Sequence, residues 1–319
     1  MLLRRSRKCA ALMAFAGTLA LLTGLAGMVF MFTASRGTRD TDYRAAVGAQ
    51  EPRRYVSVDN VKLSYTDSGG GGPVLLCLHA IGHGARDFED LSRRLSPQYR
   101  VIALDFPGQG NSGVDYQPAS GTRYAYLVGA FVKLLDLRSV TLLGNSIGGA
   151  TAIRYAHLHP ERVRALVLCD SGGLGAPNGI GRAFIGVFVQ FFAAGRRGAM
   201  WFPWVFDRYY QKVLRQDPAR LERERIVRSA YEIAPVLEQA WKSFARPEED
   251  LSPILHDVSC PVLLAWAKDD FTIPLKANTR SFEKLPDHHL EVFKGGHSAF
   301  LEDPDRFEQS LRHFLDSIR

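Results

Sequence analysis

The segment Gly144-Asn145-Ser146-Ile147-Gly148 constrains the fold of this chain more than any other. An apolar run of β-forming residues, 139–143, precedes it, and a helix-forming run, 150–156, follows it. A G-x-S-x-G pattern between a strand and a helix is typical of a sharp turn that presents the serine hydroxyl. A serine hydroxyl is a weak nucleophile that needs a base beside it, and the amides of the following helix favour developing negative charge. We therefore interpret Ser146 as a candidate nucleophile.

The first fifty residues differ from the rest of the chain. Residues 10–33 carry no charge, and these 24 residues are enough for a helix to cross a hydrocarbon layer of ~30 Å. The preceding basic residues predict a cytoplasmic N-terminus and a domain on the exterior or periplasmic side; they are Arg4, Arg5, Arg7 and Lys8. We predict that residues 1–34 form an uncleaved signal anchor with a single transmembrane helix. Residues 35–54 are polar and aperiodic, which indicates a tether.

Two other interpretations of the N-terminal segment stay open. A cleaved signal peptide would leave a secreted or periplasmic protein. Such a peptide has an apolar region of only ~7–15 residues and small residues before its cleavage site. The bulky Met31 and Phe32 stand just before the candidate site Ala34-Ser35. The remaining interpretation is a soluble protein with a buried N-terminal helix.

Nearly all of the net positive charge of the chain comes from its first 54 residues. The net charge is +7, and residues 1–54 contain nine basic against three acidic residues. The other 31 basic and 30 acidic residues nearly cancel, so the folded part is close to neutral. This distribution argues against nucleic acid as a partner.

Of the four cysteines, Cys77, Cys169 and Cys260 lie in or beside predicted strands, where buried free thiols are the usual outcome.

Strand and helix patterns alternate from Tyr55 onward, which predicts a mainly parallel sheet with helices on both faces. Tyr55–Val58 and Val61–Tyr65 are expected to form an initial antiparallel pair. A helical, irregular stretch then interrupts the alternation before the last strands. We predict core segments at 55–173 and 253–319, separated by a helical cap at 174–252. Ten aromatic residues fall within 27 residues of this cap, as its own core or as the wall of an apolar substrate pocket.

The candidate nucleophile needs a base and an acid that orients it. His297 follows the last predicted strand in a loop, and we favour it as the base over the other histidines; His79 is interpreted as a residue that hydrogen-bonds its own loop. Asp270, after the strand 262–266, is the favoured acid. Asp170 and Asp269 remain alternatives for that role. No spacing of residues indicates a metal site or an organic cofactor.

Four segments in this order resemble the cap-bearing α/β-hydrolase fold family, from about Tyr55 to the C-terminus. They are His79-Ala80-Ile81-Gly82, Asp105-Phe106-Pro107-Gly108-Gln109-Gly110-Asn111-Ser112, Gly144–Gly149, and Asp270 to Pro274 with Gly296-His297. The chain order Ser146, Asp270, His297 is that of the family's triad. The resemblance implies a mostly parallel eight-stranded sheet with a helical cap, and an oxyanion hole formed by the backbone amides of Ile81 and Ile147. Ala80 and Ala267 stand where the family often has glycine.

A narrower similarity connects the chain to carbon–carbon bond hydrolases of aromatic-ring degradation. It rests on Gly144–Ala152 and on Gly172-Gly173-Leu174-Gly175. Those enzymes also use a tryptophan next to the histidine, where this chain has Ser298, and a cap arginine. Arg225 or Arg228 is a candidate for that arginine, although we favour an exposed helix position for both.

The sequence therefore predicts a membrane-anchored serine hydrolase that acts on a small apolar ester or related acyl substrate. A carbon–carbon bond hydrolase with the same triad is the first alternative, and a catalytically idle binding protein on the same fold is the second. A haloalkane dehalogenase or an epoxide hydrolase is expected to have aspartate at position 146, so Ser146 argues against both.

Overall fold

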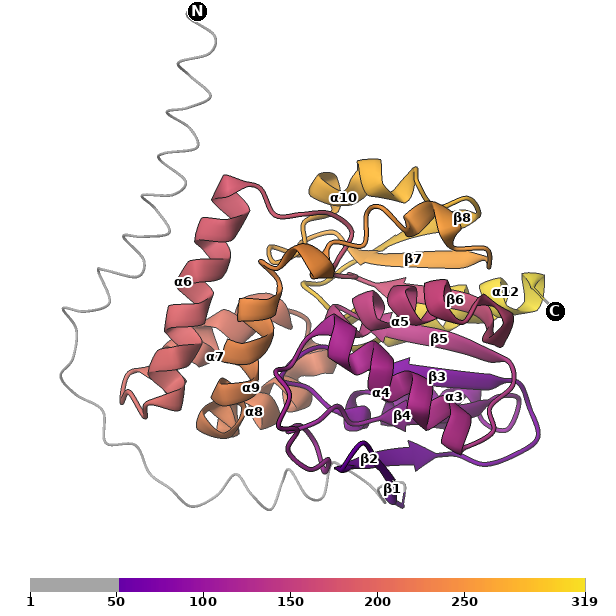
Figure 1. The fold of residues 1–319 in the computed structure, drawn as a ribbon, viewed down its shortest axis with the longest axis horizontal. Helices are drawn as coiled ribbons and strands as arrows, with labels where there is room; N and C mark the ends of the chain where they lie inside the picture. The colour runs from indigo at the N-terminus through magenta and orange to yellow at the C-terminus, as the bar shows by residue number, and fades with distance from the viewer. Residues whose placement is uncertain (1–51, 319) are drawn as a thin grey trace, which may run out of the picture. The chain divides into compact units, whose positions relative to one another are not determined.

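A single eight-stranded sheet forms the centre of the protein in the computed structural model, which describes residues 52–318 (Figure 1). The strand order is β1-β2-β4-β3-β5-β6-β7-β8. The strands are β1 (Arg54–Val58), β2 (Val61–Asp67), β3 (Val74–Leu78), β4 (Arg100–Leu104), β5 (Val140–Asn145), β6 (Val163–Cys169), β7 (Val262–Ala267) and β8 (His288–Phe293). The predicted eight-stranded sheet is confirmed.

The sheet is parallel except at one edge. β2 runs antiparallel to both β1 and β4, whereas every pair from β4 to β8 is parallel. Asp59 and Asn60 both have positive φ angles, 49° and 63°, and they turn the chain between β1 and β2 as predicted. The side chains of β3, β5, β6 and β7 are almost all buried, as expected for parallel strands covered on both faces.

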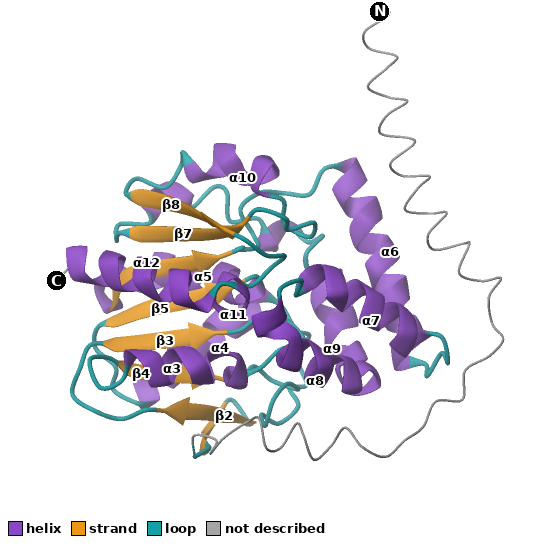
Figure 2. Cartoon of the chain, turned by 180° about the vertical axis from the view of Figure 1, so that it is seen from behind, coloured by secondary structure: helices purple, strands orange, loops and turns teal. Residues whose placement is uncertain are grey.

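Helices cover both faces of the sheet (Figure 2). On one face, α4 (Gly121–Leu134), α5 (Ile147–Leu158) and α10 (Leu275–Phe282) pack in the larger apolar core. On the other face, α3 (Glu89–Leu95), which follows the 3₁₀ turn Ala85–Phe88, packs with α11 (Ala299–Glu302) and α12 (Pro304–Ser317) in a second core. Phe88 and Phe300 stack there at 4.7 Å between ring centroids.

A helical insertion separates β6 from β7. It contains α6 (Gly179–Arg196), α7 (Phe202–Val213), α8 (Arg220–Arg228) and α9 (Ala230–Ser243). These four helices lie together beyond the ends of the parallel strands (Figure 2). The Asn178 side chain accepts a hydrogen bond from the Gly181 amide at 2.9 Å and so caps the start of α6. The carboxylate of Glu249, at the far end of the insertion, accepts hydrogen bonds from the first amides of α4.

The predicted anchor and most of the predicted tether lie outside the described residues. Within residues 52–318, no helix has both the length and the apolar character needed to cross a bilayer. Cys77, Cys169 and Cys260 are buried, as predicted.

Candidate active site

Ser146 lies at the sharp turn between β5 and α5. Its backbone has φ 56° and ψ −117°, a strained conformation for a residue with a side chain. Glycine is required on both sides: a Cβ at Gly144 would lie 2.3 Å from the Gly148 carbonyl oxygen, and one at Gly148 would lie 2.2 Å from the Leu78 carbonyl oxygen. The Ser146 carbonyl accepts hydrogen bonds from the Gly149, Ala150 and Gly172 amides. The sequence expectation of a sharp strand–helix turn at Ser146 is thus met.

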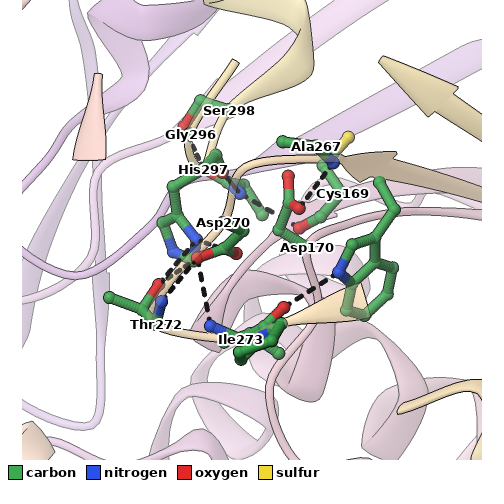
Figure 3. Close-up of polar contacts among 12 residues, drawn as sticks. Cys169, Asp170, Ala267, Asp270, Thr272, Ile273, Gly296, His297 and Ser298 are labelled. Carbon is green, nitrogen blue, oxygen red and sulfur yellow. Dashed lines mark hydrogen bonds and ion pairs between the residues drawn. The ribbon is translucent and has the colours of Figure 1, made fainter. Parts of the chain in front are cut away.

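The loop after β8 brings His297 to Asp270, which follows β7 (Figure 3). The His297 Nδ1 atom lies 2.7 Å from the Asp270 Oδ2 atom, and both side chains are buried. The other oxygen, Oδ1, accepts hydrogen bonds from the Thr272 amide (2.7 Å), the Thr272 hydroxyl (2.6 Å) and the Ile273 amide (3.0 Å). These bonds fix the carboxylate, so it orients the imidazole and leaves Nε2 for another partner.

Electrostatics make this pair ionic. Burial alone would lower the pKa of His297, but the Asp270 carboxylate raises it to about 9. Burial opposes ionisation of Asp270, yet His297 and the Thr272 and Ile273 hydrogen bonds hold its pKa below the ordinary value. Asp270 therefore stays charged and favours a protonated imidazole, which is the state of a base that has just accepted a proton.

The two alternative acids have other positions. Asp170 follows β6 and lies beside the pair, but its Oδ1 atom accepts a hydrogen bond from the Ala267 amide at 2.8 Å (Figure 3). Burial and the neighbouring Asp270 carboxylate raise the pKa of Asp170 well above its usual range. Asp269 is half-exposed and lies 3.8 Å from Arg215. Asp270 is the carboxylate of these three with a hydrogen bond to His297.

Two residues that the sequence analysis did not single out hold the histidine loop. The Oε2 atom of buried Glu302 accepts hydrogen bonds from the Gly296 (2.7 Å) and His297 (3.0 Å) amides. Its Oε1 atom accepts one from the Arg215 amide of the helical insertion at 2.6 Å. Asn145, next to the candidate nucleophile, donates to the His297 carbonyl at 2.8 Å. The position of Asn145 inside the pentapeptide was a signal for such a role, whereas Glu302, at the end of α11, gave none.

The loop after β3 lines a cavity that Ser146 and His297 also line. Ile81 and Ile147, whose amides the resemblance assigns to an oxyanion hole, are both buried and line the same cavity as Ser146 and His297. His79 accepts a hydrogen bond from the Phe106 amide and donates to the Ala80 carbonyl, so its expected role in its own loop is confirmed. Burial lowers the pKa of His79 to about 4, and the imidazole is neutral.

The glycine-rich loop after β4 supports this arrangement through Asp105. Its carboxylate accepts hydrogen bonds from the amides of Ala85 (2.7 Å) and Asn111 (3.1 Å). A Cβ at Gly110 would lie 2.0 Å from the same carboxylate, which explains why glycine occupies that position. The Gln109 side chain accepts a hydrogen bond from the Gly82 amide at 2.6 Å. The loop therefore fixes the backbone beside Ile81.

The cavity itself has a volume of about 410 Å³ and lies between the strand ends and the helical insertion. Its apolar wall includes Phe184 and Ile185 of α6, Tyr209 and Tyr210 of α7, and Trp241 of α9. No lysine or arginine is among the described residues that line it. Phe191, Phe192, Phe202 and Phe206 are instead buried against one another, so the aromatic segment forms both the core of the insertion and the cavity wall.

A second buried histidine–carboxylate pair lies beside the cavity. His83 Nδ1 is 2.6 Å from Asp87 Oδ2, and Arg225 of α8 lies 3.9 Å from the other Asp87 oxygen. Arg225 also donates to Glu222 from Nε at 2.7 Å. The expected exposed position is therefore wrong for Arg225, because this arginine pairs with acids between α8 and the loop after β3. Arg228 is exposed, as expected.

This fold and this arrangement of residues define an α/β hydrolase, and the chain belongs to the alpha/beta hydrolase fold family, whose profile matches residues 73–246. It is 30% identical over 275 residues to a 2-hydroxy-6-oxononadienedioate/2-hydroxy-6-oxononatrienedioate hydrolase of Dechloromonas aromatica (strain RCB). That alignment covers 80% of this chain and 91% of the relative. A similarly named hydrolase of Escherichia coli (strain K12 / DH10B) is 29% identical over 282 residues, covering 82% of this chain and 95% of the relative.

Solved structures of other hydrolases have the same fold. A membrane phospholipase A, described as a bacterial virulence factor, is 26% identical with a TM-score of 0.70, and the match covers 99% of both chains. An esterase from Thermogutta terrifontis is 23% identical with a TM-score of 0.72, covering 84% of this chain and 99% of the esterase. The protein is a hydrolase, as predicted.

Proposed function

We propose that this protein is a serine hydrolase that cleaves a carboxylic ester or a related acyl substrate by way of an acyl-enzyme. One observation carries the proposal: Ser146 stands on a strained turn in the same apolar cavity as a buried His297 that is hydrogen-bonded to Asp270. A nucleophile, a base and a carboxylate that orients the base are the groups that acyl transfer requires.

In this mechanism the Ser146 Oγ atom attacks the acyl carbon while His297 Nε2 takes its proton. The amides of Ile81 and Ile147 donate to the oxyanion. The imidazolium, stabilised by Asp270, then protonates the departing alkoxide, and the alcohol leaves. A water molecule attacks the acyl-enzyme with His297 again as the base, which releases the acid and restores Ser146.

The charge of the cavity favours an uncharged acyl group over a dianion. The relatives from Dechloromonas aromatica and Escherichia coli act, by their names, on a dioate, which carries two carboxylates. The described lining of this cavity offers no lysine or arginine, whereas it includes Glu249 and Asp250. Arg225 is engaged by Glu222. A buried carboxylate without a cationic partner is costly, so carbon–carbon cleavage of a dioate remains the second candidate and rests on the overall similarity to these relatives.

We also propose that the protein is held in the membrane by residues 1–34, with the hydrolase domain on the exterior or periplasmic side. The uncharged stretch and its basic flank support this, as does the similarity to a membrane phospholipase A over 99% of both chains. The protein should stay in the membrane fraction after a high-salt wash. Release of full-length protein by salt would contradict the proposal, and an N-terminus near Arg36 would indicate cleavage instead.

The reaction is tested by labelling the full-length protein with a fluorophosphonate. We expect Ser146→Ala to abolish both labelling and ester hydrolysis while the thermal unfolding stays two-state and cooperative. Ser171→Ala is a matched control, because Ser171 lines the same cavity and should leave labelling intact. Labelling of the Ser146→Ala variant at another serine would overturn the assignment.

A substrate panel separates the candidate functions. It contains p-nitrophenyl esters of increasing chain length, a phospholipid and a 2-hydroxy-6-oxo-dienedioate. Faster turnover of the dienedioate than of every ester would favour carbon–carbon cleavage. Neither labelling nor turnover would favour the catalytically idle binding protein.

A further inference from the structure

An exposed aromatic and basic surface lies where α6 ends and α7 begins. We call it the α6–α7 tip and define it as Arg196, Arg197, Met200, Trp201, Trp204 and Arg208. Met200 is 91% exposed, Trp201 46% and Trp204 49%. A cluster of exposed large apolar side chains is a mark of an interaction surface, and three of them lie here within five residues.

The tip is held rigidly by the helical insertion. Trp201, Trp204 and Arg208 are spaced by three and four residues, which puts them on one face of α7. The opposite face of this helix, including Phe202 and Phe206, is buried. The Trp201 ring also stacks on Phe191 of α6, with 6.1 Å between centroids. The tryptophans are therefore presented outward by a packed core.

The tip itself carries three arginines, Arg196, Arg197 and Arg208, and within the segment 196–208 Asp207 is the acidic residue. The Arg208 guanidinium lies 5.6 Å from the centroid of the Trp204 ring, and Arg197 is exposed in the turn before Met200. Arg196 is the exception, because its Nε atom pairs with Glu238 at 2.6 Å. The partner of this surface should thus combine an apolar layer with negative charge.

We propose that the α6–α7 tip docks onto the surface of a bilayer that contains anionic phospholipids. Tryptophan favours the boundary between hydrocarbon and headgroups, and arginine binds the phosphates beside it. Amphipathic surfaces of this composition enter the boundary to a depth of about 5–10 Å. A second copy of this chain is a poorer occupant, because a symmetric contact would bring two sets of arginines together. The proposal concerns this surface alone and does not depend on the reaction that the cavity performs.

Tryptophan fluorescence offers a direct test, since all four tryptophans lie outside the N-terminal segment. Trp201 and Trp204 belong to the tip, whereas Trp241 and Trp266 are 6% and 0% exposed. The full-length protein is reconstituted into vesicles of phosphatidylglycerol and phosphatidylcholine with brominated or ordinary acyl chains. Bromine quenches only indoles that reach the acyl region, so emission should fall by up to about half in brominated anionic vesicles. In purely phosphatidylcholine vesicles the quenching should be weaker.

Two variants locate the effect. Trp201→Phe with Trp204→Phe should lose the quenching and keep hydrolysis of a soluble ester. Arg197→Glu with Arg208→Glu should reduce quenching in anionic vesicles, because each lost basic contact weakens surface attraction about five-fold. Arg138→Glu is the control for charge reversal, since Arg138 is an exposed arginine outside the insertion. It should quench as the native protein does.

The proposal is overturned if the native protein shows no quenching, or if the Trp201→Phe, Trp204→Phe variant is quenched as strongly as the native protein. It is also overturned if quenching is absent while cross-linking through the tip joins two copies of the chain, because the surface would then be an interface between copies.

Discussion

Two buried histidine–carboxylate pairs flank one cavity, and their geometry is nearly the same. His297 Nδ1 lies 2.7 Å from Asp270, and His83 Nδ1 lies 2.6 Å from Asp87. Both imidazoles line the cavity. Their pKa values shift in opposite directions from the ordinary histidine value. Asp270 raises the pKa of His297 to about 9, whereas burial lowers the pKa of His83 to about 3. A histidine beside an aspartate is therefore not by itself evidence for a base.

The surroundings of the two carboxylates explain the difference. Thr272 and Ile273 donate hydrogen bonds to Asp270 and stabilise its charge. Burial and the nearby Glu222 carboxylate oppose ionisation of Asp87 and raise its pKa well above the ordinary range. Arg225 lowers the pKa of Glu222 even though burial would raise it. At the second pair the electrostatics thus favour the negative charge on Glu222 over Asp87.

The largest expected effect is the loss of the proposed base. We expect His297→Ala to lower kcat/KM for an ester by about 10⁶, because the nucleophile and the base act as a unit. His83→Ala should lower it by less than about ten-fold, since a neutral, buried histidine takes no proton in the proposed mechanism. Steady-state kinetics on a soluble ester compare the two. An equal loss from both substitutions would remove the distinction between the pairs.

The next largest difference is expected between replacement of Asp270 and replacement of Asp170. Asp270→Asn should reduce kcat by about 10⁴, because the imidazole loses the group that orients it and stabilises its charge. Asp170→Asn keeps an oxygen that can accept from the Ala267 amide and should change kcat far less. A large decrease in kcat for Asp170→Asn together with a small decrease for Asp270→Asn would show that the acid is Asp170, after β6.

The pH dependence tests the raised pKa of His297. Only the neutral imidazole accepts a proton, so kcat/KM should rise by about ten-fold per pH unit from pH 7 and level off near pH 9. Asp170 and Glu302 also raise the pKa of this imidazole, but Asp270 contributes the most. Residual activity of Asp270→Asn should therefore level off at lower pH. A plateau below pH 7 in the native protein would contradict the ionic pair.

The free energy of unfolding should also depend on the titration of His297. The pKa of His297 is higher in the folded protein than the ordinary value of about 6.5, so the folded state holds a proton that the unfolded state has lost. This contribution is fully present below about pH 6.5 and is lost as the pH rises toward 9. Chemical denaturation between pH 6 and 9 measures it, and Asp270→Asn should flatten the dependence.

The smallest effect is expected at the second pair. Arg225→Gln removes the cation that balances Glu222 and should lower the free energy of unfolding by about 2 kcal/mol, less than for a fully buried pair because Arg225 is partly exposed. Arg228→Gln on the same helix is the control, because Arg228 is exposed. Its change should stay within about 0.5 kcal/mol. Similar values for both variants would show that the cluster does not stabilise the insertion.

Much of the fold was predictable because its signals are local. The turn at Asp59-Asn60, the glycines around Ser146 and the apolar strands before each loop act on neighbouring residues, and the structure has these elements close to the predicted bounds. The insertion was predictable as a helical stretch for the same reason. The α6–α7 tip was visible only as part of an aromatic segment, since its exposure depends on which face of α7 packs inward.

The sequence by itself determined the sheet, the strained turn at Ser146 and three candidate acids, because glycine placement and apolar periodicity act over a few residues. Only the tertiary structure decided which carboxylate meets His297, since that contact joins residues 27 apart on different loops. It also decided that Glu302 holds the histidine loop and that Arg225 faces Asp87. The Arg225 contact depends on how the helical insertion packs over the strand ends, and burial together with the neighbouring charges sets the pKa of each group.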